Sequence, residues 1–327
     1  MMKLLWITDP WSTLDHPKDT TLRLIEESLR LGVPSYWCDV KSIRWDVSQV
    51  KLDAFEVTDV QPSRDAHAFK MRPFRKNSPE AAPTDFTRLI YRTDPPVDLA
   101  FIHPVQLLDI ALCDSKRSEL VNPAQALLMA NEKLEPTLLG PQFMPPSLAS
   151  CRWEDLVRFG KKEGRTVLKP LHLAQSLGIE LLNWRSKRDV VEAQVKLEKA
   201  TQNFTHPVLL QRYLEGILEG EKRLWYLNGK LLAVVKKNPK RGEFKIDMDL
   251  GGFLSPTTLD RKDQYAAHAI AKRLKARKIR LAAVDLIEGL ATDFNLTSPG
   301  LIAPMEPVLN ENLAKPIIKS LCKKFSD

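Results

Sequence analysis

The sequence predicts an α/β fold whose N-terminal half is an open layer and whose C-terminal half is of the α+β type. In the first half, strand-like apolar runs enclose a helix-like segment. The second half contains two pairs of short apolar runs joined by turn dipeptides, a pattern typical of antiparallel hairpins. The chain has 327 residues, which is enough for one large domain or two medium-sized domains with separate cores.

The N-terminal layer rests on three predicted strands and one predicted helix. Lys3–Thr8 is a short apolar strand, and Thr20–Leu31 has apolar residues at helical spacing, with Gly32 as its stop. Further strands are expected at Pro34–Val40 and Arg88–Arg92. The order strand, helix, strand is typical of an open α/β layer.

Three segments look less regular. Val57–Asp85 contains four prolines and mixed charges, so we expect a long loop or a short hairpin. A connector around Leu120–Pro123 is expected to end a first domain of residues 1–122 and to leave residues 123–327 for a second domain. The uncharged run Pro136–Cys151, which also contains four prolines, predicts an irregular connector.

The second half combines helices with hairpins. Asn228-Gly229 and Glu288-Gly289 each separate two short apolar runs, and an Asn-Gly pair favours the tight type I′ turn of a hairpin. The predicted helices are Trp153–Glu163, Lys187–Lys199 and Asp260–Arg277. The predicted strands are Thr166–Pro170, Val208–Leu214, Arg223–Leu227, Leu231–Val235, Leu281–Ile287 and Leu290–Leu296.

Composition and charge exclude several classes of protein. With 43% hydrophobic and 28% charged residues, the chain is neither wholly disordered nor collagen-like, and no apolar run is long enough to predict a membrane span or a secretory leader. The net charge of +8 is compatible with a solvated basic surface, an anion pocket or a nucleic-acid binder, but no reading motif for nucleic acid is present. The cysteines are isolated, which predicts buried free thiols in the cytoplasm: Cys38, Cys113, Cys151 and Cys322.

The clearest chemical pattern is Asp285 followed by Asp293-x-Asn295. Asp293 and Asn295 are two apart on one strand and therefore share a face. If the turn spans 288–290, Asp285 lies opposite Asp293, whereas a one-residue slip would separate them. Acidic side chains within apolar strands need neutralisation, and oxygen ligands suit Mg²⁺ bound with nucleotide phosphates. The alternative is a solvated acidic face.

Four other features are weak when taken singly. Lys169 ends an apolar strand and can reach a phosphate, and Lys133 is similar, although such lysines are often solvated. The segment Gln211–Leu214 ends a strand and can offer its backbone to an adenine edge, or it is an ordinary edge-strand end. Arg223 opens a hairpin, where it can bind a carboxylate or phosphate or serve as a surface charge.

In their order and spacing, these residues resemble the prokaryotic glutathione synthetase family of ATP-grasp ligases over almost the whole chain. The matching motifs are Asp9-Pro10, Lys18-Asp19-Thr20-Thr21, Arg92-Thr93-Asp94-Pro95-Pro96, Asn131-Glu132-Lys133, Leu168-Lys169-Pro170-Leu171, Gln211-Arg212-Tyr213-Leu214, Gly220-Glu221-Lys222-Arg223 and Asp293-Phe294-Asn295-Leu296-Thr297-Ser298-Pro299.

The resemblance implies an ATP-grasp fold after an N-terminal α/β (pre-ATP-grasp) domain, with a lid subdomain at about 133–210, and a homo-oligomer acting on small molecules. It also implies a reaction in two steps. The carboxylate of γ-glutamylcysteine attacks the γ-phosphate of ATP to give an acyl phosphate, and the amine of glycine then displaces phosphate to form glutathione. ADP and phosphate are the other products.

The resemblance further implies a role for each site residue. Lys133 and Lys169 bind the nucleotide phosphates, and Glu221 meets the ribose. Arg223 meets the substrate, and Lys237 and Lys245 stand where the family has arginines near the acyl phosphate. The remaining assignments are Gln211, Arg212, Tyr213 and Leu214 beside the adenine, and Asp285, Asp293 and Asn295 around Mg²⁺, with Mn²⁺ as an alternative ion.

The sequence departs from the family at several positions in this pocket. The lid loop His172–Gly178 replaces the glycine-rich Asp-Gly-Met-Gly-Gly of the family, and glycine lets the backbone fold tightly around phosphate. Lys237 and Lys245 lack the bidentate fork of arginine, and Asp247 replaces an asparagine. Ile302-Ala303-Pro304 replaces Ile-Arg-Glu. These changes support an alternative, a catalytically silent or substrate-shifted ATP-grasp protein that binds nucleotide or a partner.

Overall fold

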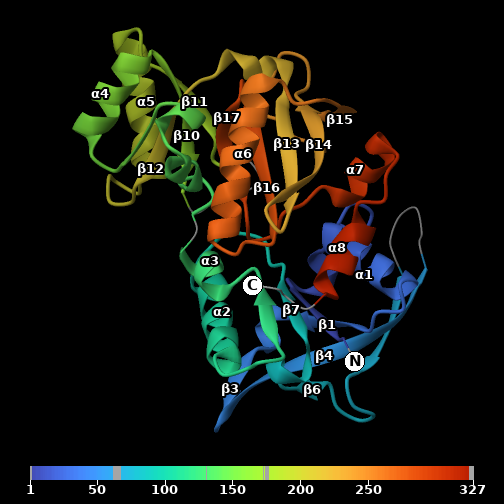
Figure 1. Cartoon of the computed structure of the whole chain (residues 1–327). Helices are drawn as coiled ribbons and strands as arrows, with labels where there is room; N and C mark the ends of the chain where they lie inside the picture. The colour runs from blue at the N-terminus through green and yellow to red at the C-terminus, as the bar shows by residue number, and fades with distance from the viewer. Residues whose placement is uncertain (1, 62–67, 130, 172, 174–176, 324–327) are drawn as a thin grey trace.

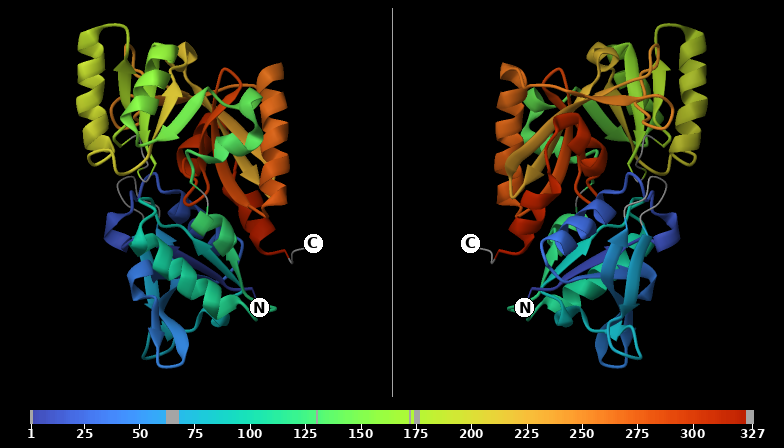
Figure 2. Two further views of the ribbon diagram at one scale, coloured as in Figure 1. Left: turned by 90° about the vertical axis from the view of Figure 1, so that its left-hand side faces the viewer. Right: turned by 90° about the vertical axis from the view of Figure 1, so that its right-hand side faces the viewer.

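The computed structural model describes residues 2–61, 68–129, 131–171, 173 and 177–323, and its strands form three sheets. Figure 1 shows the first sheet in the lower part of the molecule and the other two above it. The views in Figure 2 show the same division from both sides. The predicted class, an α/β first half followed by antiparallel hairpins, is confirmed. Within the described ranges, none of the helices has the length and apolar character needed to cross a membrane.

The first sheet is built around β1 (Leu4–Thr8), all of whose residues are buried. β1 lies between β2 and β7, and the three strands run parallel. Asp19 is the N-cap of helix α1 (Thr20–Arg30), and its carboxylate accepts a hydrogen bond from Leu22 N at 2.9 Å. The other elements of this part are β2 (Ser35–Asp39), β3 (Arg44–Asp46), β4 (Gln49–Gln61), β5 (Ala68–Pro73), β6 (Glu80–Ala81), β7 (Arg88–Tyr91), β8 (Glu119–Val121), α2 (Leu99–Leu112) and α3 (Ala124–Met129).

Three segments predicted to be irregular contain strand residues. In Val57–Asp85, β4 and β5 form an antiparallel hairpin, and residues 62–67 between them lie outside the described residues. The connector expected around Leu120–Pro123 is wrong for its first residues, because β8 pairs in parallel with β7 and extends the sheet. The connector expected at Pro136–Cys151 is likewise wrong at its end, where the short edge strand β9 (Ser147–Ser150) joins the second sheet.

The second sheet is antiparallel, with the strand order β11, β10, β12, β9. Leu156 of α4 and Leu197 of α5 pack with Leu168 and Leu210 of the sheet in one apolar core. The helices begin and end close to their predicted positions, because both carry apolar residues on one face and polar residues on the other. The bounds are β10 (Arg165–Pro170), β11 (Glu180–Asn183), β12 (Val208–Arg212), α4 (Trp153–Glu163) and α5 (Lys187–Ala200).

The third sheet is also antiparallel, with the order β15, β14, β13, β16, β17, and α6 packs against it. Both predicted hairpins are present. Asn228, Gly229, Glu288 and Gly289 have positive φ angles of 52°, 64°, 55° and 79°, as a type I′ turn requires. The bounds are β13 (Glu221–Leu227), β14 (Lys230–Asn238), β15 (Phe253–Pro256), β16 (Leu281–Ile287), β17 (Leu290–Asn295) and α6 (Arg261–Ala276).

The hairpin of β16 and β17 brings Asp285 opposite Asp293, as predicted, but through a different turn length and register. The turn has two residues rather than the expected three, since Ile287 pairs with Leu290. A bulge at Thr292 then shifts the register, so that Asp293 rather than Thr292 lies across from Asp285. Without the extra residue, Asp293 would point to the opposite face of the sheet.

Two C-terminal helices, α7 (Ile302–Leu309) and α8 (Ala314–Leu321), return to the first part of the chain. Figure 1 shows α8 beside α1. Ile317 and Ile318 share an apolar core with Leu22 and Ile25 of α1. Arg23 of α1 also donates a hydrogen bond to Glu306 of α7 at 2.6 Å. The first sheet is therefore covered on this face by the end of the chain.

Asn122 connects the first part of the chain with the third sheet. Its amide nitrogen donates to the carbonyls of Leu281 (2.8 Å) and Leu296 (2.9 Å), and its Oδ1 accepts from the backbone N–H groups of Arg280 (2.8 Å) and Leu281 (2.9 Å). The side chain is only 3% exposed.

We expect Asn122→Ala to lower the free energy of unfolding by about 2–3 kcal/mol, because it leaves buried backbone groups without partners. Urea denaturation monitored by circular dichroism measures this change. Asn131→Ala is a matched control, since its side-chain amide makes two hydrogen bonds rather than four, donating to the carbonyl of Leu171 at 2.8 Å and accepting from the N–H of Lys133 at 3.2 Å. Equal losses in the two variants would contradict this account of Asn122.

The four cysteines are free, but the prediction that all are buried is wrong. Cys38 is buried, whereas Cys113 is exposed. Burial raises the pKa of Cys38 from 9.0 to about 12. Between pH 9 and pH 12 the thiol of Cys38 keeps its proton in the folded protein, whereas it loses that proton in the unfolded chain. The contribution of Cys38 to stability is therefore complete below pH 9 and is lost as the pH rises toward 12.

From this shift we expect Cys38 to contribute about 2 kcal/mol to the fall in stability between about pH 9 and pH 11. Urea denaturation across this range should give a smaller fall for Cys38→Ala than for the natural protein. Cys113→Ala serves as the control and should follow the natural protein. The same fall in all three proteins would refute the assignment to Cys38.

Candidate active site

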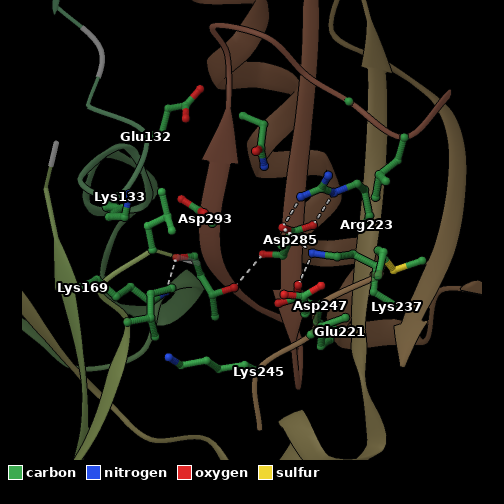
Figure 3. A pocket seen from close by; sticks show the side chains of 18 of the residues that line it. Glu132, Lys133, Lys169, Glu221, Arg223, Lys237, Lys245, Asp247, Asp285 and Asp293 are labelled. Carbon is green, nitrogen blue, oxygen red and sulfur yellow. Dashed lines mark hydrogen bonds and ion pairs between the residues drawn. The ribbon is translucent and has the colours of Figure 1, made fainter. Parts of the chain in front are cut away.

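One cavity of about 750 Å³ gathers every site residue predicted from the sequence. Its walls come from the second and third sheets, and loops of the first sheet close one end. Figure 3 shows Lys133 and Lys169 on one side, Arg223 and Lys237 on the other, and Asp285 between them. The predicted residues that line it are Lys133, Lys169, Gln211, Arg212, Tyr213, Leu214, Glu221, Arg223, Lys237, Lys245, Asp285, Asp293 and Asn295.

One end of the cavity is apolar. Tyr213, Ile217 and Ile287 form a small cluster, with partly buried apolar side chains packed around it. The sequence predicted only backbone contacts at Gln211–Leu214 and gave no sign of the opposing wall, because that wall comes from other strands and a distant loop. Such a narrow apolar slot between two sheets suits a planar aromatic base. Its further lining residues are Val167, Leu214, Phe244 and Ile246.

The side chains of Gln211 and Arg212 are already engaged elsewhere. Gln211 donates to Ser147 Oγ at 3.1 Å, and Arg212 pairs with Glu163 of α4. These two residues can therefore contact a base only through their backbone, as predicted from the sequence.

Two lysines meet beside strand β17, which carries the predicted metal ligands Asp293 and Asn295. Lys169 donates to the carbonyl of Thr292 at 2.9 Å, and Lys133 donates to the carbonyl of Leu173. Burial lowers the pKa of Lys169, while Asp293 and Glu221 act in the opposite direction. Both ammonium groups are bonded to neutral carbonyls, so their charges remain available to an anion such as phosphate.

The opposite wall holds a buried network of charges. Arg223 binds Asp285 through two hydrogen bonds, of 2.8 Å from Nε to Oδ1 and 2.6 Å from Nη2 to Oδ2. Lys237 donates to Glu221 and, at 3.3 Å, to Asp285 Oδ2. Although burial alone would raise it, the pKa of Asp285 is lowered because Arg223 and Lys237 stabilise the carboxylate. Asp285 is therefore ionised at neutral pH and firmly positioned.

The predicted metal ligands face the same cavity. Asp293 Oδ1 is buried and has no hydrogen-bond partner within the described part of the chain. Such an orphaned carboxylate oxygen fits a cation. Within these ranges, no three His, Cys, Asp or Glu side chains cluster closely enough to hold a metal ion by themselves. The donor set of Asp285, Asp293 and Asn295 therefore fits an ion that also takes oxygens from a phosphate substrate.

Several cavity residues were not assigned a role from the sequence. Glu132 Oε1 accepts hydrogen bonds from the backbone of Leu296 (2.6 Å) and Thr297 (2.9 Å) and from the Thr297 hydroxyl (3.0 Å), which fixes the end of β17 beside Lys133. Arg92 and Asp19 line the end of the cavity nearest the first sheet. These residues stand in recognised motifs, but only the fold shows that they meet.

Most departures from the family also lie at this cavity, whereas Ile302, Ala303 and Pro304 are not among its lining residues. Lys245 and Asp247 line it, and Asp247 Oδ1 accepts from the N–H groups of Asp249 (2.9 Å) and Leu250 (3.2 Å). Leu173 and Leu177 line it too. Residues 172 and 174–176 of the diverged lid sequence lie outside the described residues.

The comparisons with known proteins agree with this geometry. The model of the prokaryotic glutathione synthetase N-terminal domain matches residues 2–127, and that of the prokaryotic glutathione synthetase ATP-grasp domain matches residues 132–310. The glutathione synthetase of Parasynechococcus marenigrum is 29% identical over 320 residues, which are 98% of this chain and 99% of the relative.

Solved structures share the fold at low sequence identity. The D-cycloserine synthetase DcsG has a TM-score of 0.67 at 15% identity, covering 97% of this chain and 98% of its own. The ATP-grasp ligase PsnB, complexed with a phosphomimetic variant of its minimal precursor, Mg and ADP, has a TM-score of 0.61 at 15% identity, covering 98% of both chains. The chain thus belongs to the prokaryotic glutathione synthetase family and is an ATP-dependent carboxylate–amine ligase resembling glutathione synthetase.

Proposed function

We propose that the protein joins γ-glutamylcysteine and glycine to form glutathione, with ATP as the phosphoryl donor and Mg²⁺ as the metal ion. The observation that carries this proposal is the cavity itself. An apolar slot leads to Lys133 and Lys169, and these lysines face Arg223 and Lys237 with Asp293 and Asp285 between them (Figure 3). The full-length match to glutathione synthetases supports the choice of substrates.

The charges of the cavity suit both steps of such a reaction. Lys133 and Lys169 bind phosphate oxygens of ATP, and Glu221 and the slot around Tyr213 hold the nucleoside. Asp293, Asn295 and a remaining acceptor position of Asp285 would hold Mg²⁺, which would supply positive charge to neutralise the phosphates. Arg223 orients the reacting carboxylate.

Lys237 and Lys245 stabilise the charge that develops on the transferred phosphoryl group. These two lysines provide charge without the bidentate geometry of arginine. The proposal therefore includes weaker positioning of the acyl phosphate here than in relatives with arginines.

The division into domains and the assembly are also proposals. We propose an N-terminal domain of residues 1–122 and an ATP-grasp domain of residues 123–327, with a lid subdomain at about 133–210. The second sheet supports the lid, because its strands fall within 147–212. The homo-oligomer implied by the family resemblance and the cytoplasmic location indicated by the isolated cysteines remain predictions.

Incubation with ATP, Mg²⁺, γ-glutamylcysteine and glycine tests the proposed function. ADP and the mass of new amide are followed together. Glutathione formation with matching ADP is the expected result. ADP without glutathione would favour an acyl phosphate that is lost to water, either because glycine is the wrong amine or because the lid admits water.

The second candidate is a substrate-shifted or catalytically silent ATP-grasp protein. Asp247, a carboxylate at the wall of the phosphate-binding cavity, favours it because a negative charge there repels phosphate. Under this candidate the natural protein forms no glutathione. Asp247→Asn tests whether the charge of Asp247 is the cause. This variant keeps the Oδ1 that accepts both turn hydrogen bonds and removes only the charge.

A further inference from the structure

Arg92 is a buried arginine that the proposed reaction does not use. It follows β7 and is 4% exposed, yet it lines the cavity at the end nearest the first sheet. Its Nε donates to Thr21 Oγ1 at 3.2 Å, and its Nη1 donates to the carbonyl of Pro299 at 3.0 Å. The guanidinium is thus fixed between α1 and the segment after β17.

This cation lacks a bonded counter-charge. Both of its hydrogen-bond acceptors are neutral, and across the ranges that the structure describes no carboxylate lies within ion-pair distance of it. Burial lowers the pKa of Arg92, whereas the charges of Asp19 and Asp94 raise it. A buried charge without a bonded partner destabilises a protein, so an anion bound at this point would be stabilised.

Asp19 provides a negative charge beside this cation. It lines the same cavity, and its Oδ1 accepts the hydrogen bond from Leu22 N that begins α1. Capping needs one oxygen only, and an asparagine would supply it equally well. The second oxygen and the charge of Asp19 are therefore free for another function.

We propose that Arg92 and Asp19 bind the two charged groups of an α-amino acid, Arg92 the α-carboxylate and Asp19 the α-ammonium, at the substrate end remote from the phosphates. The proposal rests on the proposed function and names the part of the substrate that is recognised. In γ-glutamylcysteine this part is the glutamyl end, while the cysteine carboxylate reacts near Arg223 and Lys237.

A fixed guanidinium beside a carboxylate selects for this arrangement of charges. Arginine binds a carboxylate through a planar fork, and the buried position of Arg92 strengthens such a contact. A substrate without either charged group would leave one of these side chains unpaired, which is how a polar site rejects an analogue. Binding energy from this remote end would also position the reacting carboxylate.

The test uses the whole protein and two analogues of γ-glutamylcysteine. 4-Aminobutyryl-cysteine lacks only the α-carboxylate, and glutaryl-cysteine lacks only the α-ammonium. The variants are Arg92→Met, which removes the cation, Arg92→Lys, which keeps the charge without the fork, and Asp19→Asn, which keeps the helix cap. Asp98→Asn is the matched control, since Asp98 caps α2 by bonds to Ala100 and Phe101 and does not line the cavity.

We expect the natural protein to prefer γ-glutamylcysteine to either analogue by about 10- to 100-fold in kcat/KM, mainly through KM. Arg92→Met should reduce kcat/KM for γ-glutamylcysteine by a similar factor and discriminate less than about threefold against 4-aminobutyryl-cysteine. Arg92→Lys should be intermediate, and Asp19→Asn should lose discrimination only against glutaryl-cysteine. Asp98→Asn should match the natural protein, and the KM for ATP should remain unchanged throughout.

Undiminished discrimination in Arg92→Met, or none in the natural protein, would overturn the proposal. If the natural protein forms no glutathione, the proposed function fails separately. Calorimetry with γ-glutamylcysteine, Mg²⁺ and a non-hydrolysable ATP analogue then decides the inference. Binding that is lost in Arg92→Met and retained in Asp98→Asn supports it, whereas no binding, or equal binding by Arg92→Met, rejects it. If Arg92→Met has a reduced melting temperature, Arg92→Lys replaces it in these comparisons.

Discussion

Asp293→Ala will reduce ADP formation by about 1000-fold or more while leaving the protein as stable as before. The activity falls because the variant removes a carboxylate from the set that faces the phosphates. The stability is maintained because Asp293 Oδ1 has no hydrogen-bond partner to lose within the described part of the chain. A buried carboxylate oxygen without a partner destabilises the free protein, so the melting temperature of Asp293→Ala should equal or exceed that of the natural protein.

This combination separates a functional from a structural role of Asp293. Steady-state ADP release and a thermal melt are measured on the same preparation. Asp293→Glu is the conservative variant, and it should recover part of the activity because a longer carboxylate still supplies metal-binding oxygens. Turnover that is unchanged in Asp293→Ala would sink the assignment, and a large fall in melting temperature would show that the side chain supports the fold.

Asp285→Ala should have the opposite profile, with activity lost and the free energy of unfolding lowered by about 3–5 kcal/mol. Asp285 is 3% exposed and neutralises Arg223 and Lys237, so its removal leaves two buried cations without their common partner. Urea denaturation at neutral pH measures the effect. The double variant Arg223→Met with Asp285→Leu should be more stable than Asp285→Ala, because it removes the unpaired arginine as well.

The ion pair of Asp285 with Arg223 also predicts how the stability of the protein changes at acidic pH. The pKa of Asp285 is lowered in the folded protein, so its stabilisation is present above the unfolded value of 3.8 and is lost as the pH falls below it. The natural protein should therefore lose more stability below pH 3.8 than Asp285→Asn does. Parallel curves for the two proteins would contradict this account of the buried network.

The elements with a strong local pattern could be predicted from the sequence. Helices such as Trp153–Glu163 and hairpins such as that around Asn228-Gly229 depend on neighbouring residues, which a sequence displays directly. Strand β4 could also have been found, because buried Val50, Leu52 and Ala54 alternate with more exposed residues. The short strands β8 and β9 could not, since each forms only by pairing with a distant strand already in place.

The features of the site likewise divide into those that the sequence predicted and those that only the fold reveals. Asp285, Asp293 and Asn295 were predicted because two acids in apolar strands are unusual enough to require an explanation. The bulge at Thr292 that sets their register is not evident from the sequence. Arg92 was found only as part of a motif, since its lack of a bonded counter-charge depends on groups from three separate segments of the chain, which include the Thr21 hydroxyl and the Pro299 carbonyl.

The return of α7 and α8 to α1 has a consequence for the synthesis of the protein. Leu22 and Ile25 of α1 are covered by Ile317 and Ile318, which are translated after the strands of all three sheets. On the ribosome, the outer face of α1 therefore stays exposed while the other two sheets are being translated. The helix α1 is thus translated before the second and third sheets but is completed only after them, and its apolar surface is a target for chaperones during that interval.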